Sequence, residues 1–197
     1  RYCDVTEKEK LIAELEGLGK IHTLVLLAGI VRFKQADKAL LEQVNIGGTQ
    51  TVLDACKHIK LRHLVYTSSV ASLGHTDKGR KLDETSYDPE ANFGLNHYAR
   101  TKHAAEGLVR AYIADDNKAT ILQLGLMLGP DGCTFVKTLK QPAVRFAPCG
   151  NMGSVDVRDA AVSLVMAIEL PEHQWNDCFT IVGYNHSTRD IIEQLHR

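Results

Sequence analysis

The sequence lacks the features of a membrane, nucleic-acid-binding or secreted protein. No apolar run approaches the roughly 20 residues that a membrane-spanning helix requires, and no signal peptide is present. The formal net charge is -1, with basic and acidic residues interspersed, so no basic face is expected for DNA, RNA or anionic lipid. We therefore expect a small-molecule substrate, with no nucleic-acid and no membrane partner.

Closely spaced cysteine pairs are also missing. The 5 cysteines are widely spaced and include no C-x-x-C, which favours reduced thiols in a cytoplasmic protein over a disulfide framework or a zinc site. His75, His97 and His103 have no acidic or thiol partner at ligand spacing, so no metal site is predicted.

What is present is the pattern of an α/β domain. Over 197 residues, 44% are hydrophobic and 24% charged, as in ordinary globular domains. Predicted strands at 21–29, 62–69, 119–128, 153–157 and 178–183 alternate with helical patterns at 6–18, 37–58, 96–112, 158–169 and 187–196. Residues 69–94 are predicted as loop. This order implies a parallel sheet covered on both faces, with a ligand beyond the carboxyl ends of its strands.

One predicted helix carries a pair of side chains suited to proton transfer. Tyr98 and Lys102 are four residues apart in "NHYARTKHAAE", so their side chains reach the same side of the helix. A tyrosine has a reference pKa near 10, and a nearby ammonium lowers that pKa toward the working pH. Ser69, at a strand end, could hold the same substrate oxygen. By itself, the Tyr-x-x-x-Lys spacing is also common on solvated helix faces.

Several other motifs accompany this helix in a fixed order. They are "CDVT" at 3–6, "LLAGI" at 26–30, "VNIGGTQTVLDAC" at 44–56, "YTSSVASLG" at 66–74, "YARTKHAAE" at 98–106, "LGP" at 128–130 and "VDVRDAA" at 155–161. Together they resemble the extended short-chain dehydrogenase/reductase family, also called the NAD-dependent epimerase/dehydratase family. The resemblance covers nearly the whole chain and implies a Rossmann-type doubly wound parallel sheet.

The resemblance implies a role for each matching residue. Tyr98 would be the catalytic acid/base, Lys102 would lower its pKa and bind the nicotinamide ribose, and Ser69 would steady the substrate oxygen. The cofactor, NAD or NADP, would also contact Asp4, Val5, Leu27, Ala28 and Gly29, with Asn45 supporting the site. Read without the resemblance, Asp4 flanks a helix and Asn45 is a helix-interior amide. Homodimers are common in the family.

The predicted domain organisation is incomplete at its N-terminal side. Residues 1–130 would form the cofactor domain, and residues 131–197 a mixed segment that contributes a small substrate lobe and returns to the sheet. The glycine-rich turn that grips the cofactor's pyrophosphate occurs nowhere in the sequence. The first two strands and their helix are therefore expected before Arg1, and their loss would leave a gap in the middle of the sheet.

A preceding segment or another chain is expected to supply this missing part. A purified chain of only these residues should then fail to bind NAD or NADP in a calorimetric titration, because nothing in it would grip the pyrophosphate. Measurable binding of either cofactor by that chain would contradict the idea.

The segment that ends the third of these strands indicates the type of substrate. Family members that act on sugar nucleotides commonly carry Arg-Pro-x-Asn-x-Tyr-Gly-Pro there. Counted back from Gly129-Pro130, the Arg, Pro, Asn and Tyr positions hold Gln123, Leu124, Leu126 and Leu128. Leucines cannot hydrogen-bond a sugar phosphate, and burial of apolar surface favours an apolar ligand. The chain is thus most similar to members resembling 3β-hydroxysteroid dehydrogenases and dihydroflavonol reductases.

Three functions follow from these patterns. The leading hypothesis is an NAD(P)-dependent oxidoreductase that moves a hydride between nicotinamide and an alcohol or carbonyl of a fairly apolar small molecule. One alternative is a sugar-nucleotide epimerase or dehydratase, which would retain tightly held NAD. The other is a non-catalytic cofactor-sensing or scaffold subunit, which the absent glycine-rich turn supports and the intact Ser69, Tyr98 and Lys102 oppose.

Overall fold

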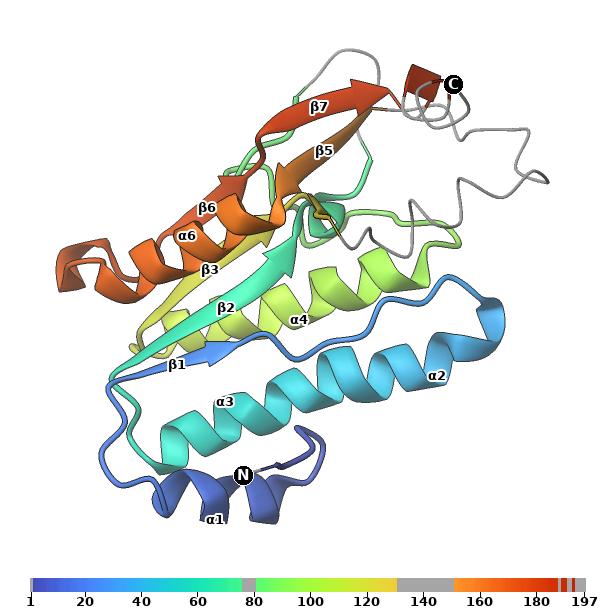
Figure 1. Ribbon diagram of the computed structural model, residues 1–197. Helices are drawn as coiled ribbons and strands as arrows, with labels where there is room; N and C mark the ends of the chain where they lie inside the picture. The colour runs from blue at the N-terminus through green and yellow to red at the C-terminus, as the bar shows by residue number, and fades with distance from the viewer. Residues whose placement is uncertain (1, 76–80, 131–150, 188, 191–192, 194–197) are drawn as a thin grey trace.

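The computed structural model describes residues 2–75, 81–130, 151–187, 189–190 and 193 (Figure 1). The described α-helices are α1 (Lys8–Glu16), α2 (Lys38–Leu41), α3 (Gly48–His58), α4 (His97–Ala114) and α6 (Val157–Glu169), and the 3₁₀- or π-helical segments are η1 (Gln35–Asp37), η2 (Glu42–Gly47), η3 (Val70–Leu73) and η4 (Glu172–Gln174). The strands are β1 (Thr23–Leu26), β2 (His63–Ser69), β3 (Ala119–Leu124), β4 (Leu126–Leu128), β5 (Asn151–Asp156), β6 (Cys178–Ile181) and β7 (Tyr184–Ser187). None of the helices in these ranges is both long and apolar enough to cross a membrane.

The main sheet is parallel and has the order β1-β2-β3-β6. Leu26 at the end of β1 pairs with Tyr66 of β2, and Ser69 at the end of β2 pairs with Leu124 at the end of β3. Because the strands run in one direction, their carboxyl ends lie along one edge of the sheet. The predicted Rossmann-type α/β fold is confirmed, and β6 returns the chain to this sheet beside β3.

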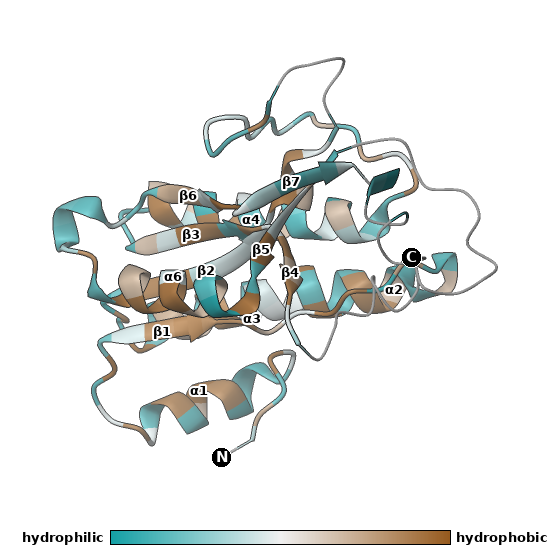
Figure 2. Cartoon of the chain, turned by 45° about the horizontal axis from the view of Figure 1, so that its top comes forward, coloured by the Kyte–Doolittle hydropathy of each residue, from teal (hydrophilic) through white to brown (hydrophobic). Residues whose placement is uncertain are grey.

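Helices cover both faces of the main sheet. Figure 1 shows α3 and α4 on one face and α6 on the other, with α1 beyond α3. Along β2, Leu64 and Tyr66 pack in the core cluster beneath α3 and α4, whereas Val65 packs on the α6 side. A strand buried on both faces must be apolar at successive positions, which explains its continuous apolar run. Figure 2 shows teal and brown alternating along α1, as expected for a helix with one buried side.

A second sheet, with the order β4-β5-β7, lies beyond the end of β3. The single strand predicted at 119–128 is therefore wrong, because the chain leaves the main sheet at Gly125. A Cβ at this position would stand 2.9 Å from the carbonyl oxygen of Gly153. Only glycine lets the two backbones approach so closely, so the chain can turn from β3 into β4 here.

One further prediction about elements needs correction, because residues 70–73, predicted as loop, form η3, a helical turn capped by the Ser69 side chain. The helix start predicted at Ser187 is confirmed. Ser187 ends β7, its hydroxyl accepts a hydrogen bond from the Asp190 amide at 3.0 Å as a helix cap does, and residues 189 and 190 are helical. The rest of that predicted helix lies largely outside the described residues, as do residues 131–150 of the predicted substrate lobe.

The expected gap inside the sheet is not observed. Residues 2–3 are not in a strand, and the described strands of the main sheet pair without interruption from β1 to β6. An extended segment needs a neighbouring strand for its backbone hydrogen bonds, and no described strand lies on the free edge of β1. The segment instead turns at Asp4, whose carbonyl accepts from the Glu7 amide at 3.1 Å.

His63, at the start of β2, makes the stability of this fold depend on pH. It is fully buried, stacks on Trp175 with ring centroids 4.4 Å apart, and its Nε2 lies 2.9 Å from the Thr120 hydroxyl. Burial lowers the pKa of His63 from 6.5 to about 4, with a smaller contribution from His22. The neutral ring therefore stabilises the fold fully above the unfolded pKa of 6.5, and this contribution is lost as the pH falls toward 4.

We predict that His63 accounts for a fall of roughly 3 kcal/mol in the free energy of unfolding between pH 6.5 and pH 4. The H63Q variant should lack that part of the acid sensitivity, because glutamine takes up no proton. Denaturant titrations at both pH values measure it, with H173Q, which alters an exposed histidine, as the matched control. Equal acid sensitivity in H63Q and the unaltered protein would contradict the prediction.

Candidate active site

A cleft of ≈ 160 Å³ lies at the carboxyl ends of β1, β2 and β3. Its polar lining residues are Thr67, Ser68, Ser69, Tyr98 and Lys102, and its other lining residues are Leu27, Gly29, Ile30, Val31, Leu124, Gly125 and Met127. The structure thus brings Ser69, Tyr98 and Lys102 together in one cavity, although they come from a strand and a separate helix. Of the predicted cofactor contacts, Leu27 and Gly29 share that cavity.

Ser69 is the last residue of β2, where the chain turns from the sheet into η3. Its backbone is extended, and its hydroxyl accepts a hydrogen bond from the Ala71 amide at 3.2 Å, which caps η3. The carbonyl of Ser69 lies 2.7 Å from the Ser72 hydroxyl. These bonds hold Ser69 at the mouth of the cleft in a half-buried position.

Tyr98 lies in the first turn of α4. Asn96 begins this helix, its side-chain oxygen accepting from the Ala99 amide at 3.0 Å. The Tyr98 ring meets the Phe33 ring edge-on, with centroids 6.1 Å apart. Burial raises the pKa of Tyr98, and a hydrogen bond with the Ser69 side chain partly opposes that rise.

Lys102 lies one turn further along α4 and is 8% exposed. Its ammonium donates to the carbonyl of Thr67 at 2.7 Å and lies 4.9 Å from the centroid of the Tyr66 ring, a favourable cation–π position. Burial lowers the pKa of Lys102 from 10.5 to about 8, and the negative charge of Glu106 opposes this shift. The lysine therefore loses its proton only a little above neutral pH.

The expected lowering of the Tyr98 pKa is not seen in this structure, and the effect of Lys102 on it stays a prediction. The pKa of Tyr98 is raised, because burial of the phenol is the largest effect on it and Ser69 supplies the opposing one. The ammonium is itself buried and bound to the Thr67 carbonyl. Proximity on the helix therefore does not by itself ionise the tyrosine.

Asn45 lies behind the cleft in η2, a π-helical stretch between α2 and α3. Its Oδ1 accepts from the Ile30 amide at 2.8 Å, and its Nδ2 lies 3.1 Å from both the Ile30 carbonyl and the Thr101 hydroxyl. The side chain is 3% exposed and joins the loop after β1 to α4. Its hydrogen bonds, rather than a place in the lining, connect it to the cleft.

Three predicted cofactor contacts lie outside the cleft lining. Asp4 is exposed and its Oδ1 accepts from the amide and hydroxyl of Thr6 at 2.9 and 2.7 Å, which lowers the pKa of the carboxyl group. Asp4 thus flanks a helix, which is the interpretation of this residue without the family resemblance. Val5 packs on the start of α3, where a Cβ on Gly48 would stand 2.8 Å from it. Ala28 is exposed on the loop after β1.

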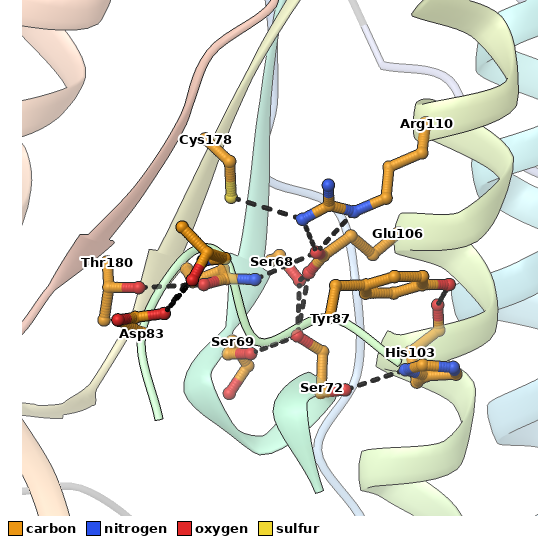
Figure 3. A network of polar contacts seen from close by, with 12 residues as sticks. Ser68, Ser69, Ser72, Asp83, Tyr87, His103, Glu106, Arg110, Cys178 and Thr180 are labelled. Carbon is orange, nitrogen blue, oxygen red and sulfur yellow. Dashed lines mark hydrogen bonds and ion pairs between the residues drawn. The ribbon is translucent and has the colours of Figure 1, made fainter. Parts of the chain in front are cut away.

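Sequence reasoning missed Glu106, the last residue of "YARTKHAAE". It is fully buried on α4, and Figure 3 shows its carboxylate among Ser68, Ser72 and Arg110. Its spacing of one turn from both Lys102 and Arg110 was the available signal. Gln123, expected at a substrate-binding position, donates to Glu106 at 2.9 Å instead.

Two of the histidines considered as metal ligands, His97 and His103, have structural contacts. Nε2 of His97 lies 2.5 Å from Oε1 of Gln35, and Nδ1 of His103 lies 2.8 Å from the Ser72 carbonyl. Within the described ranges, no three His, Cys, Asp or Glu side chains are grouped so that they could hold a metal ion.

A parallel sheet with helices on both faces and a cleft beyond its strand ends defines a Rossmann-type α/β protein. The family comparison makes this assignment more specific. The chain belongs to the 3-beta hydroxysteroid dehydrogenase/isomerase family, whose model matches residues 1–123.

Among curated proteins, the chain is similar to 3 beta-hydroxysteroid dehydrogenase/Delta 5-->4-isomerase of Monkeypox virus, with 34% identity over 111 residues, 54% of this chain and 30% of the relative. It is also similar to 3 beta-hydroxysteroid dehydrogenase type 7 of Mus musculus, with 34% identity over 108 residues, 54% of this chain and 28% of the relative. The matched region is thus less than a third of the length of these relatives.

Solved structures share the fold. The Thermus thermophilus UDP-glucose 4-epimerase, in complex with NAD, has a TM-score of 0.78 at 21% identity, covering 98% of this chain and 66% of that one. The Bacillus anthracis dTDP-glucose 4,6-dehydratase, also in complex with NAD, has a TM-score of 0.76 at 16% identity, covering 98% of this chain and 61% of that one. At these identities the likeness describes the architecture of the chain.

We predict that N45A lowers the free energy of unfolding by about 2 kcal/mol, because the Ile30 amide then loses its buried acceptor. Hydrogen exchange of that amide should accelerate as well. Denaturant titration and exchange measured by mass spectrometry test this, with N92A as the control. The Asn92 side chain also accepts from a backbone amide, that of Gly94 at 2.9 Å, but in an exposed turn. Equal losses in the two variants would show that Asn45 does not join the loop to α4.

Proposed function

We propose that this chain carries the proton-transfer site of an NAD(P)-dependent oxidoreductase that acts on an alcohol or carbonyl group of a fairly apolar small molecule. The observation that carries the proposal is one cleft lined by Ser69, Tyr98 and Lys102 together with apolar side chains. Membership of the 3-beta hydroxysteroid dehydrogenase/isomerase family supports the same reaction class.

The three polar side chains divide the proton chemistry between them. The Tyr98 hydroxyl gives a proton to the substrate oxygen during reduction and takes it back during oxidation. The Ser69 hydroxyl, which is hydrogen-bonded to Tyr98, donates to the same substrate oxygen and orients it. The Lys102 ammonium lies in the same cleft, where a positive charge favours the phenolate that forms when Tyr98 has given up its proton.

The nicotinamide end of a dinucleotide fits the residues of this cleft. An ammonium has three hydrogens, and the Lys102 bond to the Thr67 carbonyl uses one of them, so this side chain would hold the ribose hydroxyls. Leu27 and Gly29 would line the adjoining surface. When bound, the cofactor supplies or accepts the hydride. Relatives of the same fold are described in complex with NAD, which supports a cofactor of this type.

The chemistry of the cleft supports an apolar substrate. Leu124 and Met127 line it beyond β3, and Leu27, Val31 and Met127 are 61%, 53% and 46% exposed. Such side chains gain free energy when a ligand removes them from water, by about 25 cal/mol for each Å² buried. Gln123, the polar side chain nearest in sequence to Leu124, has its amide bound to Glu106 and Thr180, so it is not available to a sugar phosphate.

We predict that Y98F lowers kcat at least 100-fold with a small effect on substrate KM, because the proton donor is lost while the ring and its packing remain. Turnover of apolar secondary alcohols with NAD and with NADP, measured by absorbance of the reduced nicotinamide in the full protein, tests this. Y112F, on the same helix but in the core beneath the sheet, is the control.

An oxidoreductase rate that survives Y98F unaltered would show that Tyr98 is not the acid/base. Turnover of sugar nucleotides in preference to apolar alcohols, with NAD retained through purification, would favour an epimerase or dehydratase instead. The comparison of cofactors also determines whether NAD or NADP is used.

A further inference from the structure

The carboxylate of Glu106 lies behind the cleft, surrounded by hydrogen-bond donors (Figure 3). One oxygen, Oε2, accepts from the hydroxyls of Ser68 and Ser72 at 2.6 and 2.7 Å. The other, Oε1, accepts from Nε and Nη2 of Arg110 at 3.0 and 2.8 Å and from Nε2 of Gln123 at 2.9 Å. A fully buried carboxylate requires such partners, because it has lost the hydration that stabilises its charge.

Two of these donors lie on either side of Ser69. Ser68 precedes it in β2, and Ser72 lies in the turn that Ser69 caps, with the Ser72 hydroxyl 2.7 Å from both the Ser69 carbonyl and the carboxylate. The carboxylate therefore holds the end of β2 and η3 against α4. Without it, the backbone around Ser69 would lose two of its hydrogen bonds to the helix that carries Tyr98.

The same carboxylate lies one helical turn from Lys102. Residues four apart on a helix are neighbours, so the order Lys102, Glu106, Arg110 places a negative charge between two positive ones. Glu106 opposes the effect of burial on Lys102 and favours its protonated form. Through its hydrogen bonds the Glu106 carboxylate acts on Ser69, and through its charge it acts on Lys102. These are the two residues that work with Tyr98 in the proposed reaction.

We propose that Glu106 is a positioning residue of this site, which holds Ser69 in place through Ser68 and Ser72 and keeps a negative charge one helical turn from Lys102 for proton transfer at Tyr98. The catalytic consequence of this inference rests on the proposed oxidoreductase function. The hydrogen bonds and the charge that position the site do not depend on that function. Glu106 is not among the residues that line the cleft, so its effect would reach the reaction through Ser68, Ser72 and Lys102.

Within the described part of the chain, few other ionisable groups lie around Lys102 and Glu106, and the titration of each can be monitored. Tyr66 of β2 lies beneath the Lys102 ammonium, and Arg110 binds the carboxylate. Two further groups have pKa values that depend on the charges of Glu106 and Arg110. They are Tyr87, in the segment before α4, and Cys178 of β6, whose pKa also depends on the charge of Glu84. Each of these tyrosine and cysteine pKa values is raised mainly by burial.

The test measures the titration of Lys102 itself, by NMR of protein labelled with ¹³C at the lysine side chain, in the full protein. The signal of Lys102 is assigned from its absence in K102R. In E106Q the midpoint should fall by on the order of one pH unit, a roughly tenfold loss of ammonium at a fixed pH above the midpoint. In R110Q it should rise, because the cation beside the carboxylate is removed.

E42Q is the matched control, because Glu42 also pairs with an arginine of α4, Arg100, at 3.0 Å, but the two side chains are 45% and 41% exposed. It should leave the Lys102 midpoint unchanged. Circular dichroism checks the fold of every variant. If E106Q does not fold, R110Q decides by the direction of its shift.

Turnover gives an independent readout. In E106Q the pH profile of kcat should move in the same direction as the Lys102 midpoint, with kcat reduced about tenfold or more and KM little changed. A Lys102 midpoint that is the same in E106Q, R110Q and the unaltered protein would overturn the proposal. If neither the unaltered protein nor any variant turned over an alcohol, the proposed function would fail. The titration of Lys102 would still test the role of Glu106.

Discussion

The parallel pairing of β2 with β1 on one side and β3 on the other determines where every residue of the cleft lies. It places Leu26, Ser69 and Leu124 at the same edge of the sheet. Thr67 strengthens this edge, because its hydroxyl donates to the Leu26 carbonyl at 2.9 Å and its carbonyl accepts from Lys102 at 2.7 Å. Loops that are far apart in the sequence therefore open into one cavity, and α4 can reach that cavity only because it packs along β2 and β3.

The polar interior of α4 is the second feature on which the site depends. A helix that covers a sheet would ordinarily present only apolar groups to it, as Ala105 and Val109 do here. Lys102 and Glu106 are buried among them, and a charge in such a place is stabilised only by close partners. Thr67 and Tyr66 are the partners of the Lys102 ammonium. The Glu106 carboxylate is hydrogen-bonded by Ser68, Ser72, Arg110 and Gln123. These partners therefore fix the positions of both the Lys102 ammonium and the Glu106 carboxylate in the fold.

Much of the site could be predicted from the sequence, and the failures have physical causes. Helical spacing predicts that Tyr98 and Lys102 share one side of a helix, the family resemblance assigns them and the strand-end Ser69 to a site, and the cavity contains all three. The pKa of Tyr98 is raised rather than lowered as expected, because spacing gives the distance along a helix but not the burial of the phenol. Glu106 was missed because a glutamate on a helix is ordinarily a solvated charge.

The sequence by itself determined the α/β class, the direction of the sheet and the helix that carries the tyrosine and lysine, because hydrophobic periodicity and residue spacing are local properties. Only the tertiary structure decided that Asn45 joins the loop after β1 to α4, that Gln123 turns from the cleft to Glu106, and that the chain leaves the main sheet at Gly125. Each of these depends on which atoms meet across the fold, and contacts between distant segments are not encoded in the spacing of neighbours.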